Sequence, residues 1–437
     1  MVIFGAKGTV MRRGLVALGG LVLFITAGFG SAGAVLAHER ARDRDRGRHH
    51  YTVYWDQNEE EDFLRMPSGR SGLLIPPWDP NGQLCIVPDG SGRFVVGYNP
   101  TLPGQNNPGS ALTPKSPPVG EALYDRHARF TGQTLFTAGP FHLPGQTVGG
   151  DIPPDGSSGT FNNNGTFTGC AFDSHGNLFA SDLGTAQGDF PPPDDGRIIE
   201  WFAPSYRSAC VVFGPTDGGV GPHHVDGTGG LRQPGDLAVD HNGDLLVPEA
   251  GALQNGLPGG RVLRFDHTSL PRRSRNCGPD GLYPRSRIRS SVFVQGSLTT
   301  LPFPIAIARD PICKCWAVDS TFGDPAVAWF DDAGNPVRGH STIPGEPLAQ
   351  IGQDPNGYNP FGIAFAPDGT LYLVDIHITC TGLLSGCGPA SHAGRVLRFT
   401  FKAGQPNPPT AIASGLDFPT SVTVCTRDDG PCPRRRG

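Results

Sequence analysis

Four acidic residues recur at the same place in a repeated sequence pattern. Each ends a run of alternating apolar residues that follows a turn, as in GNLFASD and GDLLVPE, and the four are Asp182, Glu249, Asp319 and Asp375. Converging carboxylates can hold Ca²⁺, which takes about six to eight oxygen ligands. Alternatively, such a carboxylate accepts hydrogen bonds from backbone N–H groups of the neighbouring turn. The structural use is favoured, because one site rarely needs the same residue in every repeat.

Histidines form the second group that could do chemistry. His223 and His224 stand in GVGPHHVDGTGG, and His377 follows Asp375 in VDIHITC. Histidine binds metal ions and acts as a general base near neutral pH. If these insertions share one face, His223 or His224 would meet His377; the alternative is that all three are exposed loop residues. No Gly-x-Ser-x-Gly sequence supports a serine hydrolase.

A repeated supersecondary unit must position these residues. The hexapeptide GRVLRF occurs at Gly260–Phe265 and again at Gly394–Phe399. Each copy follows an alternating strand, a turn with Asn-Gly or Asp-Gly, and a second alternating strand that ends in an acid. The segments GRFVVGY, GRIIEWF and PAVAWF mark related third strands. With 63 Gly and 44 Pro punctuating short apolar runs, the chain is expected to be all-β with many tight turns.

The repeats predict a ring of small sheets. One such unit cannot bury both faces alone, whereas units placed around an axis pack face to face as the blades of a β-propeller. Five units are visible, and a decayed sixth fits between Tyr98 and Thr168, around ARFTGQTLFTAGPF. We therefore expect six blades, with five or seven as alternatives. The net charge of −5 gives no case for nucleic acid as a partner.

The ring is expected to close through both ends of the domain. The strand-like stretch FPTSVTVC, at Phe418–Cys425, has no second strand after it. We expect it to pair with strands near Leu84–Val96, and a Cys85–Cys425 disulfide would lock that closure.

The N-terminus has the pattern of an export signal. Two arginines precede an apolar stretch that ends in Val-x-Ala, which predicts a signal peptide at residues 1–37 and a secreted or periplasmic protein. The alternative is an uncleaved anchor, the one case in which a membrane is a partner. Residues 38–71 are predicted to be a charged flexible linker, residues 72–428 the propeller, and residues 429–437 a flexible tail.

All ten cysteines lie beyond this signal, so export favours disulfides. The spacing of Cys380 and Cys387 suits a loop staple. Cys313 and Cys315 are expected on one strand face, each with a different partner. A zinc site is the competing interpretation, although no paired CxxC pattern is present.

The repeat resembles the NHL repeat and the blades of the senescence marker protein and gluconolactonase family of six-bladed propellers. The resemblance covers Trp78 to Cys425 and implies the architecture. The fold hosts lactonases, lyases and binding proteins, so it does not fix an activity. In gluconolactonase-type enzymes Glu, Asn and Asp from different blades hold a divalent cation. Here GDLAVD offers Asp236, but LLIPPWDPNG in the first blade lacks the glutamate, and the equivalent positions elsewhere are Cys170, Ile305 and Gly362.

Two functions follow as hypotheses. The first is an exported binding or scaffold propeller that holds a small molecule, a protein or another cell-envelope partner with loop inserts on one face. The second is a metal-dependent hydrolase of the lactonase type at the mouth of the channel, using Ca²⁺ or Zn²⁺. In that case the expected catalytic residues are His377 and Glu249, and the expected metal ligands are Asp236, Glu249, Asp375, His223 and His224.

Overall fold

A computed structural model gives the fold. The structure describes residues 33–34, 37–39, 51–55, 58–59, 79–99, 120–125, 130–134, 167–182, 196–206, 208–214, 231–250, 259–278, 282–297, 300–347, 357–382, 385–390, 392–416 and 419–426. The predicted C-terminal tail and most of the predicted signal peptide lie outside these residues. Within them, no helix is long and apolar enough to cross a membrane.

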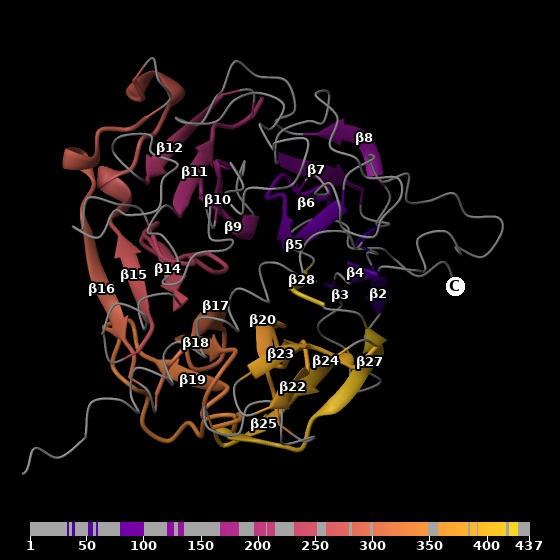
Figure 1. Cartoon of the computed structure of the whole chain (residues 1–437). Helices are drawn as coiled ribbons and strands as arrows, with labels where there is room; N and C mark the ends of the chain where they lie inside the picture. Colours follow the sequence, from indigo (N-terminus) through magenta and orange to yellow (C-terminus); the bar gives the residue numbers. More distant parts are fainter. Residues whose placement is uncertain are drawn as a thin grey trace, which may run out of the picture.

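Six sheets of three or four antiparallel strands surround a central axis (Figure 1). The first blade is β5 (Asp79–Ile86), β6 (Phe94–Asn99), β7 (Gly120–Tyr124) and β8 (Phe130–Thr134), and the second is β9 (Phe167–Phe172), β10 (Leu178–Asp182), β11 (Arg197–Trp201) and β12 (Ala209–Phe213). The third is β13 (Ala238–Val239), β14 (Leu245–Glu249), β15 (Arg261–Phe265) and β16 (Ser290–Gln295). The fourth is β17 (Pro304–Asp310), β18 (Cys315–Ser320) and β19 (Val327–Phe330), and the fifth is β20 (Pro360–Phe365), β21 (Leu371–Asp375), β24 (Gly394–Phe399) and β27 (Thr410–Leu416).

The sixth sheet closes the ring. It is ordered β2 (Ala37–Glu39), β3 (Thr52–Trp55) and β28 (Val422–Cys425), and β28 contacts both β20 and β5. A blade built from both ends is therefore present, and the six-bladed propeller is confirmed. Its composition differs from the prediction in one respect. Between Tyr98 and Thr168 the described strands β7 and β8 complete the first blade.

The pairing of the C-terminal strand also differs from the prediction. β28 pairs with β3, with Val422 opposite Trp55, rather than with Leu84–Val96. β3 lies inside the segment predicted to be a linker, and Val53, Tyr54 and Trp55 are buried there. The apolar residues of TVYW supply the closing blade with its middle strand, because they can cover the face of the fifth blade.

Shorter pairs of strands complete the described structure. β1 (Gly33–Ala34) pairs with β4 (Asn58–Glu59), β22 (Ile378–Gly382) with β23 (Ser385–Pro389), and β25 (Phe401–Lys402) with β26 (Gln405–Pro406). Three 3₁₀ turns, η3 (His267–Ser269), η4 (Ser274–Asn276) and η5 (Arg285–Arg287), lie between β15 and β16.

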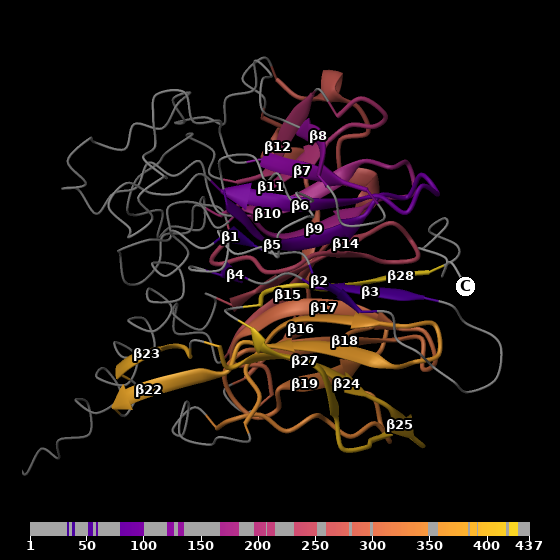
Figure 2. The same cartoon turned by 90° about the vertical axis from the view of Figure 1, so that its right-hand side faces the viewer.

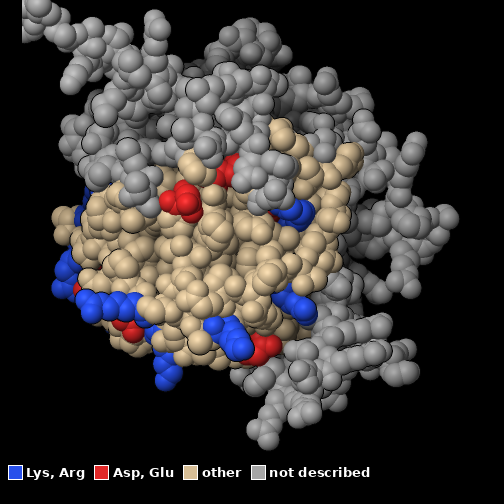
Figure 3. Space-filling model, turned by 90° about the horizontal axis from the view of Figure 1, so that it is seen from below, with Lys and Arg blue, Asp and Glu red and all other residues tan. Residues whose placement is uncertain are grey.

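The core lies between neighbouring blades. One apolar cluster joins Leu246 and Val262 of the third blade to Trp316 and Val318 of the fourth. Similar clusters join the first blade to the second, the second to the third, the fourth to the fifth, and the fifth to the closing blade. Seen from the edge of the ring, the described surface is mostly uncharged, with basic and acidic side chains scattered over it (Figure 3). The blades are thus held by apolar faces that no single sheet could bury alone.

Two disulfides join segments far apart in the sequence. Cys85 of the first blade bonds to Cys170 of the second, and Cys210 bonds to Cys277. The predicted Cys85–Cys425 disulfide is therefore wrong, because the closing blade places β3 beside Cys425 and leaves Cys85 facing β9. Cys425 is also disulfide-bonded.

Candidate functional site

The acids of the predicted site that the structure describes lie at one end of the blades. In each antiparallel pair the end of the second strand lies beside the start of the first, since Pro234 bridges to Glu249 and Pro360 pairs with Asp375. The innermost strands line the axis (Figure 1). The acids that end the second strands therefore lie at one face of the ring, around the mouth of its axis.

Glu249 in the third blade is buried, and both of its carboxylate oxygens have partners. One carboxylate oxygen accepts a hydrogen bond from the backbone N–H of Arg232 at 2.8 Å. The other forms an ion pair with the guanidinium of Arg261. Arg261 is the first of the two arginines in the Gly260–Phe265 copy of GRVLRF, and the strand register places it directly opposite Glu249.

Asp375 in the fifth blade repeats this arrangement. Its Oδ1 accepts hydrogen bonds from the backbone N–H groups of Asn359 at 3.0 Å and His377 at 3.1 Å. Its Oδ2 accepts from Nε of Arg395, the arginine of the second GRVLRF segment, at 3.0 Å. The hexapeptide is repeated because its arginine neutralises the buried acid of the adjacent strand. In the second blade the register likewise sets Asp182 opposite Arg197.

Asp319 in the fourth blade does not occupy the equivalent position. Ser320, one residue further on, occupies it: Ser320 pairs with Pro304 as Asp375 pairs with Pro360, and both first strands contain a bulge just after that proline. The carboxylate of Asp319 turns to the bulge of β17, and its Oδ1 accepts from the N–H of Ala306 at 2.6 Å. Its Oδ2 is buried without a hydrogen-bond partner. The third strand here is PAVAWF, so no arginine faces the acid.

Asp236 lies next to Asp319 at the axis. The N–H of Asp236 donates to the carbonyl of Ile305 at 2.6 Å, and the N–H of Ile305 donates to Asp319 at 3.2 Å. The Asp236 carboxylate accepts from the backbone N–H groups of Cys170 at 3.1 Å and Leu237 at 2.9 Å. The two acids are therefore linked through one residue of the innermost strand.

Burial changes the protonation of these two acids. Desolvation raises the pKa of Asp236 to about 7, although two backbone N–H groups oppose the shift. The pKa of Asp319 rises to about 8, again mainly by desolvation, and the charge of Asp236 adds to it. Two buried carboxyl groups with raised pKa values form a candidate acid–base or cation-binding group.

The inner wall beside this pair is closely packed. A Cβ atom on Gly235 would lie 1.9 Å from the carbonyl oxygen of Ile305, so only glycine fits where the third blade meets the fourth. The hydroxyl of Ser181 donates to the carbonyl of Gly235 at 2.7 Å and ties the second blade to the same point. The acids are thus held by a rigid frame of backbone contacts.

The structure brings together some of the predicted residues. Asp236 and Asp319 approach one another, whereas Glu249 and Asp375 belong to blades on either side of the fourth. His377 is half-buried at the base of the β22–β23 hairpin, with φ of +48°. His223 and His224 lie outside the described residues. The assignment of catalytic and metal-binding roles to these residues stays a prediction.

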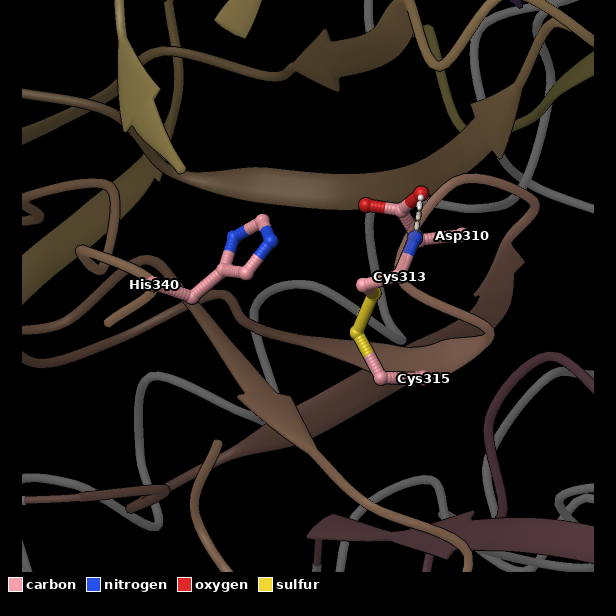
Figure 4. A group of neighbouring side chains, drawn as sticks. All are labelled: Asp310, Cys313, Cys315 and His340. Carbon is pink, nitrogen blue, oxygen red and sulfur yellow. Dashed lines mark hydrogen bonds between the residues drawn. A yellow bond between two sulfur atoms is a disulfide. The ribbon is translucent and has the colours of Figure 1, made fainter. Parts of the chain in front are cut away.

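A different cluster has the geometry of metal ligands. Asp310, Cys313, Cys315 and His340 place one potential ligand atom each within 4.8 Å of one another (Figure 4). Asp310 and His340 were not singled out in the sequence. A signal was present in DPICKC, which is longer than the DSHGN and DHNGD turns of other repeats. A second such group among the described residues is formed by Asp244, Asp266 and His267.

Cys313 and Cys315 are bonded to each other. The prediction that each has a different partner is wrong, because the first of them lies in a turn and not in a strand. β17 ends at Asp310 and β18 begins at Cys315, and Lys314 between the cysteines has φ of +57°. This reversal lets the two sulfurs meet.

Comparisons with known proteins give the fold a context. No family model matches the chain, and no curated protein does either. Among solved structures it is similar to a gluconolactonase from Xanthomonas campestris, at 12% identity over 89% of this chain and 90% of that one, with a TM-score of 0.39. It is also similar to a calcium-binding protein, regucalcin, from Agrobacterium tumefaciens, at 13% identity over 74% and 77% of the chains, with a TM-score of 0.37. A streptogramin B lyase matches at 10% identity over 90% and 91%, with a TM-score of 0.36.

Proposed function

We propose that the protein is an exported propeller that binds a cell-envelope ligand on the face where the second strands end. The observation that carries the proposal is that two acids at that face are bound to other groups of their own blades. Glu249 and Asp375 each form an ion pair with a GRVLRF arginine and accept backbone hydrogen bonds. These contacts leave neither carboxylate available without breaking the blade that holds it.

Recruiting either acid to a metal ion would be costly. The ion would have to displace Arg261 or Arg395 and leave a guanidinium group without its partner. Removing one member of a buried ion pair typically costs about 3–5 kcal/mol. The two acids therefore serve the fold in preference to hydrolysis.

The β22–β23 hairpin supplies a surface for binding. It is inserted between β21 and β24 of the fifth blade and projects from the body of the ring (Figure 2). Its register places Cys380 opposite Cys387, which agrees with the spacing that predicts a staple. Loops held on a rigid scaffold are the usual place for ligand contacts. The disulfides of the body support an oxidising compartment, and hence export.

The test is a sedimentation assay with cell envelopes of the producing organism. The intact protein is compared with a variant in which residues 379–388 are replaced by a Gly-Ser link. We expect saturable binding by the intact protein and a loss of at least about tenfold in the variant, which corresponds to about 1.4 kcal/mol. Equal sedimentation of both proteins would count against the proposal. The melting temperature of the variant serves as the control for folding.

A metal-dependent hydrolase is the second candidate, and one observation favours it. Asp319 has a buried carboxylate oxygen without a hydrogen-bond partner, and the charge of Asp236 raises the pKa of Asp319. Together they would hold a divalent cation, which would polarise an ester carbonyl. The fit is incomplete, because the glutamate expected in the first blade is absent from the sequence.

Elemental analysis after dialysis distinguishes the two candidates. The hydrolase predicts about one divalent ion per chain, a melting temperature that falls with chelator, and metal-dependent cleavage of a lactone. Asp319→Asn would then lose both the ion and the activity. The binding propeller predicts that chelator changes neither the melting temperature nor envelope binding.

A further inference from the structure

The turn between β17 and β18 departs from its counterparts in other blades. In the second blade, Oδ1 of Asp173 accepts from the N–H groups of His175 and Asn177, both at 2.8 Å. Asp310 starts the fourth-blade turn in the same way and accepts from the N–H groups of Ile312 at 2.8 Å and Cys313 at 3.3 Å. The fourth-blade turn is one residue longer, and that added length accommodates a Cys-Lys-Cys sequence.

The Cys313–Cys315 disulfide contributes little to holding the chain together. The stabilisation from a disulfide grows with the length of the loop that it closes. Cys85–Cys170 and Cys210–Cys277 span 85 and 67 residues, whereas Cys313 and Cys315 are two residues apart. The short bond therefore calls for a role other than cross-linking.

His340 is held against this pair of sulfurs. It follows β19, and its ring stacks on Trp329, with centroids 5.3 Å apart and planes at 24°. Its Nδ1 is buried and has no hydrogen-bond partner. Asp310 and Cys315 are each 3% exposed, and Cys313 is half-buried. A nitrogen without a partner, a carboxylate and two sulfurs thus share one small space (Figure 4).

We propose that the reduced Cys313 and Cys315, together with His340 and Asp310, form a redox-controlled binding site for a zinc-class divalent cation. Two thiolates, an imidazole and a carboxylate make up a four-coordinate set of the kind that zinc takes in proteins. The disulfide form is the metal-free state of this site. The site lies at the turn between first and second strands, at the opposite end of the blade from Ser320.

The switch between the two states balances as a two-electron exchange. A dithiol reductant attacks the half-buried Sγ of Cys313, and the S–S bond breaks as a disulfide forms in the reductant. Both cysteines are left as thiols, with two protons taken from the reductant. The cation then binds the two thiolates and releases these two protons to solvent. An oxidised dithiol reverses the sequence and expels the ion.

The experiment begins with mild reduction of the whole protein. Alkylation and peptide mapping should show Cys313 and Cys315 labelled before Cys85 and Cys170, because Cys313 offers a half-buried sulfur to the reductant whereas Cys85 and Cys170 are both buried. Reduced, desalted protein is then titrated with Co²⁺ as a spectroscopic probe and with Zn²⁺ in competition. We expect one ion per chain with thiolate-to-cobalt absorption in the reduced protein, and no such binding in the oxidised protein.

Matched variants test the remaining two ligands. His340→Asn and Asp310→Asn should each weaken zinc binding by at least about 10- to 100-fold, the loss that even outer-shell partners cause. His175→Asn, which changes an exposed histidine in the equivalent turn of the second blade, should bind as the unaltered protein does. Cys313→Ser with Cys315→Ser should abolish the cobalt spectrum.

Two results would overturn the proposal. One is a reduced protein that binds no more zinc than the oxidised protein does. The other is a His340→Asn variant whose zinc affinity equals that of His175→Asn. Because the titration compares oxidised and reduced forms of the unaltered chain, its outcome does not depend on whether any variant folds.

Discussion

The fourth and fifth blades each bury an acidic residue near the end of the second strand, but they surround it with different groups. At the end of its second strand the fifth blade has Asp375, paired with Arg395 of GRVLRF. At the corresponding place the fourth blade has Ser320 opposite Ala326, and its acid, Asp319, has moved to the neighbouring position. One blade buries a charge with its counterion, and the other buries an acid that is largely protonated.

The difference shows how a repeat acquires an individual site. Where a blade keeps both the acid and the arginine, the two side chains form an ion pair with each other and stabilise the blade. Where the arginine is lost, the acid keeps an unpaired oxygen and a raised pKa. The same blade carries the Cys313–Cys315 turn, so both departures from the repeat fall in the fourth blade. Irregularity within the repeats is the better guide to chemistry than the acids that recur.

A large loss of stability is expected from breaking the ion pair of the fifth blade. Arg395→Met leaves the carboxylate of Asp375 fully buried with only backbone N–H partners. We expect the free energy of unfolding to fall by about 3 kcal/mol, as for other buried pairs that lose one member. Denaturant unfolding near neutral pH measures this. Lys402→Met, an exposed control in the same blade, should stay within about 0.5 kcal/mol of the unaltered protein.

The corresponding substitution in the third blade, Arg261→Met, tests whether the ion pair matters in both blades. Arg261→Met should cost a similar amount, because Glu249 is buried in the same way. If both arginine variants unfold with unchanged free energy, the acids are not held by these pairs and the comparison fails.

A pH-dependent effect is expected at Asp319. Its pKa of about 8 in the folded state lies above the usual aspartate value, so the folded chain binds a proton that the unfolded chain has lost. Stability from this group is complete at acidic pH and is lost as the pH rises from about 4 to about 8, by at most about 1.4 kcal/mol per pH unit. The Asp319→Asn variant should lack this pH dependence of the free energy of unfolding. It should therefore become more stable relative to the unaltered protein as the pH rises.

Denaturant unfolding at several pH values checks that prediction. Asp236→Asn should act in the same direction over a narrower range, since the pKa of Asp236 rises only to about 7. Parallel curves for the unaltered protein and Asp319→Asn would show that the carboxyl of Asp319 is ionised in the folded state.

The smallest effect on stability is expected at the Cys313–Cys315 turn. Replacing both cysteines with serine removes a bond that closes a very short loop, so the loss should be about 1.5 kcal/mol or less. The same replacement at Cys85 and Cys170 should cost about 4.5 kcal/mol by loop-closure entropy. Thermal or denaturant unfolding under oxidising conditions measures both. Equal losses would mean that the short disulfide is structural after all.

Much of the fold could be predicted, because the same strand–turn–strand pattern recurs along the chain. The two GRVLRF segments and the turns before them fix antiparallel register, and that register sets each arginine opposite an acid. The closing strand β3 was missed for a compositional reason. Only TVYW is apolar there, and the charged residues on both sides dominate any average over the segment. Four residues are enough to form this strand, because the first and fifth blades supply apolar surface on both sides of it.

The site was harder to predict, because backbone irregularities decide it. Asp319 lies one position before the place that Glu249 and Asp375 occupy, a shift that only the strand register reveals. The same holds for Cys313 and Cys315, where an alternating strand would forbid the bond that a turn with a left-handed Lys314 allows. His340 reaches the sulfurs from beyond β19, a contact between segments that spacing alone does not reveal.

The position of β28 has a consequence for how the molecule is made. β28 is the innermost strand of the closing blade, and the strands outside it come from the beginning of the domain. β3 therefore gains its inner strand partner only when Val422–Cys425, almost the last part of the domain, has been synthesised. A chain that ends before these residues would leave one edge of β3 unpaired in the middle of the closing blade.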